Sequence, residues 1–201
     1  MLKTFIKLQI TLYILGISLL SGCVSLDSAT QPEVAEHIKL AYQTALISMK
    51  KGKYKLAIKQ FNKIIKQQPG LAGPHTNLGI IYLKKKSLDK ARQSLEKAIE
   101  LNKQSTIAYN HLGIVYRNMG RFDDAEQAYL KAIEINTSYD YAHLNLGILY
   151  DLYKSDGNKA INHYQQYLKL SNKPDKMVEK WIVDIQRQNK TAASNAKETP
   201  G

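Results

Sequence analysis

Cysteine is nearly absent from the sequence, since Cys23 is the only one among 201 residues. A single thiol excludes an intramolecular disulfide. It also provides no thiolate pair for zinc, and no two of the five histidines have the spacing of a zinc-binding helix. We therefore expect no bound metal.

Motifs of enzyme chemistry are missing as well. The chain has no GxSxG sequence, no glycine-rich phosphate loop and no pair of carboxylates set apart from a helix start. Asp123 and Asp124 open a predicted helix, where negative charge offsets the helix dipole without any substrate. We expect a protein that is not an enzyme and holds no cofactor.

Only one long apolar run is present, from Leu8 to Leu20, and it follows Lys3 and Lys7. It is too short for a membrane span, which needs about 20 apolar residues. A positive start, an apolar middle and small residues before a cleavage point are typical of an export signal. The run therefore predicts a signal peptide over 1–22.

The segment Leu20-Ser21-Gly22-Cys23 resembles the lipobox of bacterial lipoproteins. The resemblance implies that Cys23 is lipidated and becomes the first residue of the mature chain, followed by a lipid-anchored linker over 23–35. Several acyl chains together give durable anchoring. The alternative role of Cys23 is a small buried apolar residue, but the flanking sequence offers no core.

Positive charge is in excess, with 29 lysines and arginines against 17 acidic residues and a net charge of +12. An exported lipoprotein rarely meets nucleic acid, so we expect no nucleic-acid partner. Anionic lipid head groups, acidic cell-wall polymers or an acidic protein segment are the candidate counterparts. Solubility alone is an equally good explanation.

A repeat of 34 residues runs through the chain from residue 36 to residue 173. Gly79, Gly113 and Gly147 recur at this interval, and the apolar residues within each unit have helical spacing. Each unit is a predicted helix hairpin, in which the glycine leaves room for the facing helix backbone. Hairpins of this kind stack and share one core. The predicted units are 38–71, 72–105, 106–139 and 140–173.

The units resemble the tetratricopeptide repeat (TPR) family. The third unit carries the family's signature residues except the final proline, where it has Thr137. His75 and His143 stand at the aromatic position of their units, where a ring fills space between helices. The signature residues of the third unit are Tyr109, Leu112, Gly113, Tyr116, Ala125, Tyr129 and Ala132.

The resemblance implies an all-α solenoid of about four hairpins. The segment 174–190 reads as a capping helix, with Ser171 or Asn172 as its cap and Pro174 in its first turn. Met177, Trp181 and Ile185 form its apolar stripe. Residues 191–201 are small and polar, and we expect them to be disordered.

In TPR proteins the first helices of successive hairpins line a groove that holds a peptide. Carried over by position, Ile80, Ile114 and Ile148 form an apolar row flanked by side-chain amides, which suits an extended peptide. The alternative is that the isoleucines only pack on their neighbours. TPR proteins that clamp a C-terminal carboxylate use a lysine at the position where this chain has Tyr42. This difference argues against such a clamp here. The predicted groove residues are Tyr42, Asn77, Ile80, Lys84, Asn110, His111, Ile114, Arg117, Asn145 and Ile148.

The lipobox and the repeats together predict a lipid-anchored adaptor in a Gram-negative envelope, with a protein or peptide segment as its partner. Val24 after the cysteine implies, by resemblance to enteric lipoproteins, sorting to the outer membrane and a domain facing the periplasm. The chain end resembles TPR lipoproteins associated with TonB/ExbB/ExbD systems. A pilotin-like factor for a type IV pilus secretin and a scaffold for peptidoglycan enzymes are the alternatives. The oligomeric state is left open.

Overall fold

The computed structural model describes residues 31–198. The predicted signal peptide and Cys23 lie outside the described residues. Within them the chain forms nine α-helices and no strand, and contacts divide it into Met1–Ala41 and Tyr42–Gly201. Each unit is described by itself, although the first helix runs across the boundary. In the first unit Ile38 is buried, and Lys39 pairs with Glu36 at 3.4 Å.

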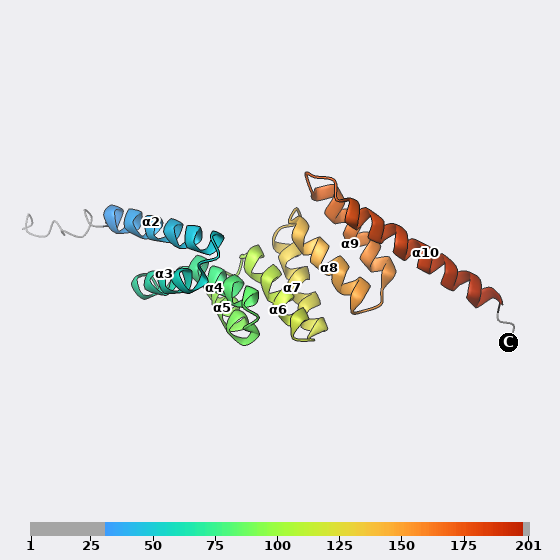
Figure 1. Cartoon of the computed structure of the whole chain (residues 1–201), viewed down its shortest axis with the longest axis horizontal. Helices are drawn as coiled ribbons and strands as arrows, with labels where there is room; N and C mark the ends of the chain where they lie inside the picture. The colour runs from blue at the N-terminus through green and yellow to red at the C-terminus, as the bar shows by residue number, and fades with distance from the viewer. Residues whose placement is uncertain (1–30, 199–201) are drawn as a thin grey trace, which may run out of the picture. The chain divides into compact units, whose positions relative to one another are not determined.

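The second unit is a stack of helix hairpins, which confirms the predicted all-α solenoid (Figure 1). Within it α4 pairs with α5, α6 with α7 and α8 with α9, and α10 packs on α9. We call the first helix of each hairpin A and the second B. The helices are α2 (Gln31–Lys50), α3 (Tyr54–Gln67), α4 (Ala72–Lys84), α5 (Leu88–Leu101), α6 (Thr106–Asn118), α7 (Phe122–Ile135), α8 (Asp140–Leu152), α9 (Gly157–Leu170) and α10 (Lys176–Glu198).

The turn between helices A and B contains a residue with positive φ in every repeat and closes in the same way in the first three. A residue with positive φ ends helix A: Gly52 (71°), Lys86 (57°), Gly120 (76°) and Ser155 (52°). In the first three repeats the next amide donates to a carbonyl five residues back, as in a Schellman motif. In the fourth repeat the amide after Ser155 reaches back six residues, to Tyr150. This accounts for its one extra residue.

The 34-residue glycines make room mainly for side chains, which corrects the sequence-based explanation at Gly113 and Gly147, whereas at Gly79 the Ala91 carbonyl oxygen of the facing helix also lies 3.3 Å from an added Cβ. A Cβ added at Gly113 would lie 2.5 Å from Cε1 of Tyr129, and one at Gly147 would lie 2.6 Å from Cδ1 of Tyr164. At Gly79 the nearest atom is Cγ of Leu95, at 2.5 Å. Each glycine therefore receives the large residue of its own helix B, and these three large side chains are fully buried.

The C-terminal helix differs from its prediction in three respects. Its cap is Asp175, whose carboxylate accepts from the amides of Met177 and Val178 at 3.1 and 3.3 Å, so Pro174 precedes the helix. Its buried side chains are those of Val178, Ile182 and Ile185, whereas Met177 is 60% exposed. Of the predicted stripe, Ile185 is buried and Trp181 packs on the core against Tyr164, whereas Val178 and Ile182, expected beside the stripe, take the buried place of Met177, because that face meets α9.

Helix extends further at both ends of the described chain than the sequence predicted. α10 runs to Glu198 through most of the predicted tail 191–201, and α2 begins at Gln31 inside the predicted linker 23–35. Thr191 and Ser194 donate their hydroxyls to carbonyls one turn back, at 3.1 Å each, so polar residues are accommodated in the helix. Within residues 31–198 no helix is both long and apolar enough to span a bilayer.

Candidate functional site: the surface of the A helices

The predicted groove residues all come from A helices, and α6 contacts both α4 and α8 directly. Their burial is not uniform. Lys84 is exposed, and Asn110 is only 2% exposed. The remaining eight are half-buried: Tyr42, Asn77, Ile80, His111, Ile114, Arg117, Asn145 and Ile148.

Two amide bonds connect neighbouring A helices across the repeat boundaries. The Asn77 amide donates to the Tyr42 hydroxyl at 2.6 Å and to the Gly73 carbonyl at 3.0 Å. Two repeat boundaries later, between the third and fourth repeats, the Asn145 amide donates to the Asn110 side-chain carbonyl oxygen at 3.0 Å. Because Asn110 is buried, we assign it to the contact between α6 and α8 rather than to the ligand surface. Both Asn77 donor hydrogens are used, so its carbonyl oxygen is the group left for a ligand.

The equivalent pair between α4 and α6 is different. Thr76 donates its hydroxyl to the Ala72 carbonyl at 3.2 Å, and His111 Nδ1 lies 2.8 Å from the Ile107 carbonyl. A carbonyl only accepts, so Nδ1 carries the proton and Nε2 is a free acceptor. Burial lowers the pKa of His111, and Lys84 adds to this, while the bond to Ile107 opposes it. His111 is therefore neutral at pH 7.

The isoleucine row serves two purposes at once. Ile114 and Ile148 pack against the buried cluster that includes Leu146, Leu149 and Tyr164. All three isoleucines nevertheless remain half-buried and keep part of their side chains at the surface. The two sequence-based interpretations, core contact and apolar ligand surface, are thus compatible.

Arg117 is the most unusual polar group on this surface. Its Nε and Nη1 atoms are buried, and neither has a hydrogen-bond acceptor within the described part of the chain. The Tyr129 hydroxyl is also buried without a partner, and its pKa is raised by burial although Arg117 acts in the opposite direction. Among the described residues Asp151 forms no ion pair, and its carboxylate accepts from the Tyr164 hydroxyl at 3.2 Å. Two of the three guanidinium nitrogens of Arg117 are therefore buried without an acceptor, on a side chain that is half-buried as a whole.

A residue comparison in the sequence could have singled out Arg117. The same repeat position holds Met49 in the first repeat and Leu83 in the second. The fourth repeat has Asp151 there, so Arg117 is the one cation among the four equivalent residues, and a cation at this position indicates a specific requirement. The sequence predicted Arg117 as a groove residue, but it did not show that the guanidinium is buried and unpaired.

A second polar cluster, which the sequence analysis missed, joins the third and fourth repeats. Glu126 accepts from the Tyr150 hydroxyl at 2.5 Å and pairs with Lys154. His143 and His163 face each other with their Nδ1 atoms 3.1 Å apart, so one donates and the other accepts. Burial lowers the pKa of His163 to about 4, and the neighbouring His143 adds to this.

A cavity of about 340 Å³ lies at the turn edge of the third and fourth repeats. Its charged side chains pair with one another: Arg121 with Asp124 and Lys154 with Asp123, each at 2.7 Å. Phe122 and Tyr153 pack together with ring centroids 4.8 Å apart. With its charges satisfied internally, this cavity offers no free group for a ligand. The cavity lining is Gly120, Arg121, Phe122, Asp123, Asp124, Tyr153 and Lys154.

Family models agree with this architecture. Models described as tetratricopeptide repeat match residues 38–70, 70–138 and 104–173. The chain therefore belongs to the tetratricopeptide repeat family, whose members are generally non-catalytic scaffolds for protein–protein interaction. No protein of curated function matches the sequence.

Solved structures share the fold. PilF of Pseudomonas aeruginosa is 20% identical with a TM-score of 0.71, covering 78% of this chain and 71% of PilF. MamA is 24% identical with a TM-score of 0.60, covering 71% of this chain and 83% of MamA. YrrB, a TPR protein with an unusual peptide-binding site, is 25% identical with a TM-score of 0.58, covering 70% and 71%.

Proposed function

We propose that this protein is a lipid-anchored adaptor of the cell envelope, which binds an extended peptide segment of a partner on the surface of its A helices. The isoleucine row would bury the apolar side chains of the segment. The free Asn77 carbonyl oxygen and His111 Nε2 would accept from its backbone amides. YrrB, a TPR protein of the same fold, is described as having a peptide-binding site.

The single observation that carries the proposal is the pair of buried guanidinium nitrogens of Arg117, Nε and Nη1, that have no acceptor among the described residues. A buried donor without an acceptor is unfavourable, and a carboxylate or carbonyl oxygen of a bound segment would remove that penalty. The ligand chemistry that fits is therefore a short segment with apolar residues and one acceptor, such as an aspartate, glutamate or chain terminus, placed beside Ile114.

The envelope part of the proposal is supported by the sequence. The signal-like segment 1–22 and the Leu-Ser-Gly-Cys motif at Cys23 favour a lipoprotein, and Val24 favours the outer membrane with the domain in the periplasm. The resemblance of the chain end favours a partner from a TonB/ExbB/ExbD-type complex. Cys23→Ser should move the protein out of the membrane fraction, and an unchanged distribution would disprove the anchor.

The groove is tested by photo-crosslinking in living cells from position 114, with the captured protein identified by mass spectrometry. The matched control is the same photo-reactive residue at Gln127, an exposed position on α7. We expect one dominant envelope protein from position 114 and none of it from position 127. Capture from position 127 alone would assign the function to the B-helix side and make the groove structural.

Arg117→Leu separates binding from folding, because leucine is the natural residue at the equivalent position 83. Removing an unpaired buried charge should leave the midpoint of urea unfolding unchanged or higher. Capture from position 114 should nevertheless be lost. Undiminished capture by the folded Arg117→Leu variant would show that Arg117 does not contact the partner.

A pilotin-like assembly factor for a type IV pilus secretin is the second candidate. It shares with the first the lipid anchor and the repeat array, and PilF of Pseudomonas aeruginosa has the same fold over most of both chains. The crosslinking experiment decides between them, since a captured secretin subunit favours the pilotin-like role. Capture of a peptidoglycan synthase or hydrolase would favour a wall-enzyme scaffold instead.

A further inference from the structure

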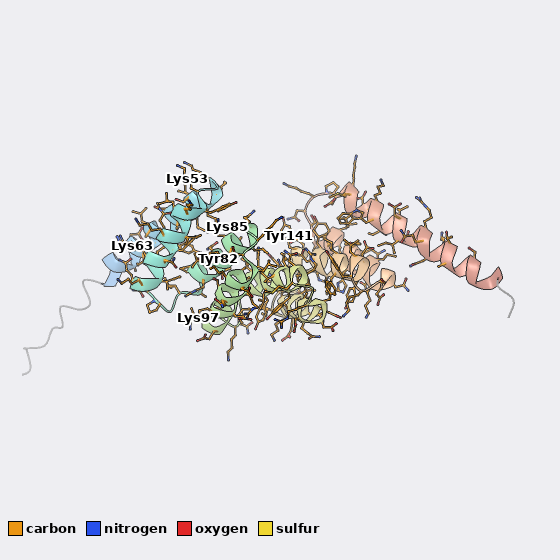
Figure 2. The ribbon with its side chains drawn as sticks, turned by 60° about the horizontal axis from the view of Figure 1, so that its bottom comes forward. Lys53, Lys63, Tyr82, Lys85, Lys97 and Tyr141 are labelled. Carbon is orange, nitrogen blue, oxygen red and sulfur yellow. The ribbon has the colours of Figure 1, made fainter. Side chains whose placement is uncertain are left out.

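A second surface, apart from the A-helix groove, lies at the turns of the first two repeats. We call it the lysine edge. Because the two turns are 34 residues apart, they occupy the same edge of adjacent repeats, and all six lysine side chains are exposed. In Figure 2 Lys53 and Lys85 lie toward the upper side of the ribbon, whereas Lys97 lies at the lower side. The lysine edge consists of Lys50, Lys51, Lys53, Lys84, Lys85 and Lys86.

The positive charge of the lysine edge is not neutralised within the protein. Residues 42–86 contain ten lysines and neither an acidic residue nor an arginine. None of the six edge lysines takes part in an ion pair among the described residues. The same edge in the next two repeats is different, because Arg121 pairs with Asp124 and Lys154 pairs with Asp123.

The backbone conformation of Lys86 also sets the lysine edge apart. Its φ is 57°, in the left-handed region that favours glycine, and it stands where the neighbouring repeats have Gly52 and Gly120. A lysine there is strained, although glycine would close the same turn without strain. The sequence thus places a third consecutive lysine at the one turn position that least favours a side chain.

Apolar side chains accompany the charge at the first turn. Ile47 is 55% exposed, and its carbonyl accepts from the Lys51 amide at 3.0 Å, so it lies one turn below the lysines. Leu56, three residues after Lys53 on α3, is 44% exposed. Lysines together with exposed isoleucine and leucine at one tip are typical of a surface that rests at a membrane interface.

We propose that the lysine edge binds the surface of an anionic phospholipid bilayer, with Ile47 and Leu56 entering the head-group region. Ammonium groups are compact charges without the directional fork of arginine, which suits head groups that move laterally better than a fixed carboxylate. An acidic polymer or peptide would leave the two apolar side chains unmatched. The proposal concerns a surface apart from the groove and stands without it.

The test uses a fluorophore that responds to polarity, attached to the full chain in vesicles. In the Cys23→Ser background, Leu56→Cys provides the only thiol for labelling. The matched control carries Leu152→Cys in the same background, since Leu152 ends α8 and is 66% exposed. The vesicles are phosphatidylcholine alone or phosphatidylcholine with phosphatidylglycerol. The segment 1–22, with Lys3, Lys7 and the apolar run 8–20, is the same in every sample. Differences between positions 56 and 152, or between the lysine variants, in the same vesicles therefore report the domain.

We expect a blue shift at position 56 in the anionic vesicles only, and none at position 152. Replacing Lys50, Lys51 and Lys53 by glutamine should abolish the shift, because each lysine near an anionic surface contributes roughly a five-fold gain in binding. The charge-matched control replaces Lys173, Lys176 and Lys180, exposed residues near and within the start of α10, and should retain the shift.

Three results would overturn the proposal. No shift at position 56 in anionic vesicles means that the edge does not reach the lipid. An equal loss of the blue shift in the edge variant and in the α10 control variant means that binding depends on net charge alone. The third result combines two observations: the fluorophore at position 56 shows no shift in anionic vesicles, and the protein binds soluble polyglutamate unless Lys50, Lys51 and Lys53 are replaced. It would identify an acidic polypeptide as the ligand instead.

Discussion

Two neighbouring regions of the solenoid are built from the same kind of hairpin but differ in whether their charged side chains form ion pairs. Residues 42–86, the lysine-rich region, form no ion pair among the described residues. Residues 87–170, the ion-paired region, form seven. There the Tyr116 hydroxyl also donates to Glu96 at 3.2 Å, and Tyr150 donates to Glu126 at 2.5 Å.

The comparison shows that surface ion pairs are not what holds a hairpin of this solenoid together. In the lysine-rich region Ala57, Phe61 and Ile64 of α3 are at most 1% exposed, as completely buried as their counterparts further along the chain. Exposed pairs contribute little to stability, whereas each large buried side chain contributes about 1.5–3 kcal/mol. The surface charges of the first repeats are therefore free to serve binding.

The largest effect should come from filling the glycine position in the ion-paired region. Gly113→Ala places a Cβ 2.5 Å from the buried Tyr129 ring, which cannot rotate away. We expect a loss of about 2 kcal/mol in the free energy of unfolding, measured by urea titration. Gly79→Ala is the matched change in the lysine-rich region, where it meets the side chain of Leu95 at 2.5 Å.

Leu95 can change its rotamer more readily than a tyrosine ring, so Gly79→Ala should cost about half as much. Alanine also forms helix better than glycine, which offsets part of both losses. Equal losses at the two positions would show that the packing of the two regions does not differ as the side chains suggest.

The next effect is a dependence on pH that should be largest in the ion-paired region, although burial also lowers the pKa of His75 in the lysine-rich region. His163 has its pKa lowered from 6.5 to about 4 by burial and by His143, so the folded state resists protonation. Stability is then complete above pH 6.5 and is lost as the pH falls from 6.5 toward 4. We expect a loss on the order of 1 kcal/mol, allowing for solvent screening of the partly exposed ring.

His163→Ala tests this directly, because Ala128 is the natural residue at the same place in the third repeat. The variant should lose part of the slope of unfolding free energy against pH between 6.5 and 4. The remaining slope would come from His75, His111 and His143, whose pKa values burial also lowers. Glu126 is distinguishable because its pKa is lowered from 4.5: burial raises it, but the bonds from Lys154 and Tyr150 outweigh burial.

A smaller effect concerns the strained turn. Lys86→Gly removes the unfavourable left-handed φ of 57° and one charge from the lysine edge. We expect the free energy of unfolding to rise by about 0.5–1 kcal/mol, seen as a higher urea midpoint. Gly120→Lys makes the reverse change in the ion-paired region and should lower stability by a similar amount.

The smallest effect is the response to salt. Raising the ionic strength from about 0.01 M to 0.15 M shortens the Debye length and screens the repulsion among the edge lysines. Amide hydrogen exchange should therefore slow in α3 and α4 by a few tenths of a kcal/mol, while α7 and α9 should change little or exchange faster. Parallel behaviour of the two regions would mean that the lysines repel one another too weakly to matter.

Much of the fold followed from the sequence because its pattern is repeated. The 34-residue interval, the helical spacing and the turn glycines predicted an all-α solenoid, and the structure confirms it. The stripe of the C-terminal helix was predicted correctly at Ile185 and Trp181 but wrongly at Met177, since Met177 and Val178 are both apolar and only contact with α9 decides which is buried. The start of α2 and the end of α10 were also predicted wrongly, because the residues there have no strong helix-start or helix-stop signal.

The candidate site was predictable in outline but not in its chemistry. Repeat position alone placed Ile80, Ile114 and Ile148 on A helices. It did not reveal that Asn110 is buried against Asn145, or that the Arg117 guanidinium is buried without an acceptor. These are properties of packing between repeats, which depend on side chains 34 or 35 residues apart.

The sequence by itself determined the repeat, the helices and the distribution of charge, because helical periodicity and a lysine-rich segment without carboxylates are local properties of the chain. Only the tertiary structure decided which polar groups are satisfied. Lys154 reaches Asp123 and Glu126 across a repeat boundary, whereas within residues 31–198 neither Arg117 nor any edge lysine forms an ion pair. Pairing requires two side chains to meet in space, and that depends on how the hairpins stack.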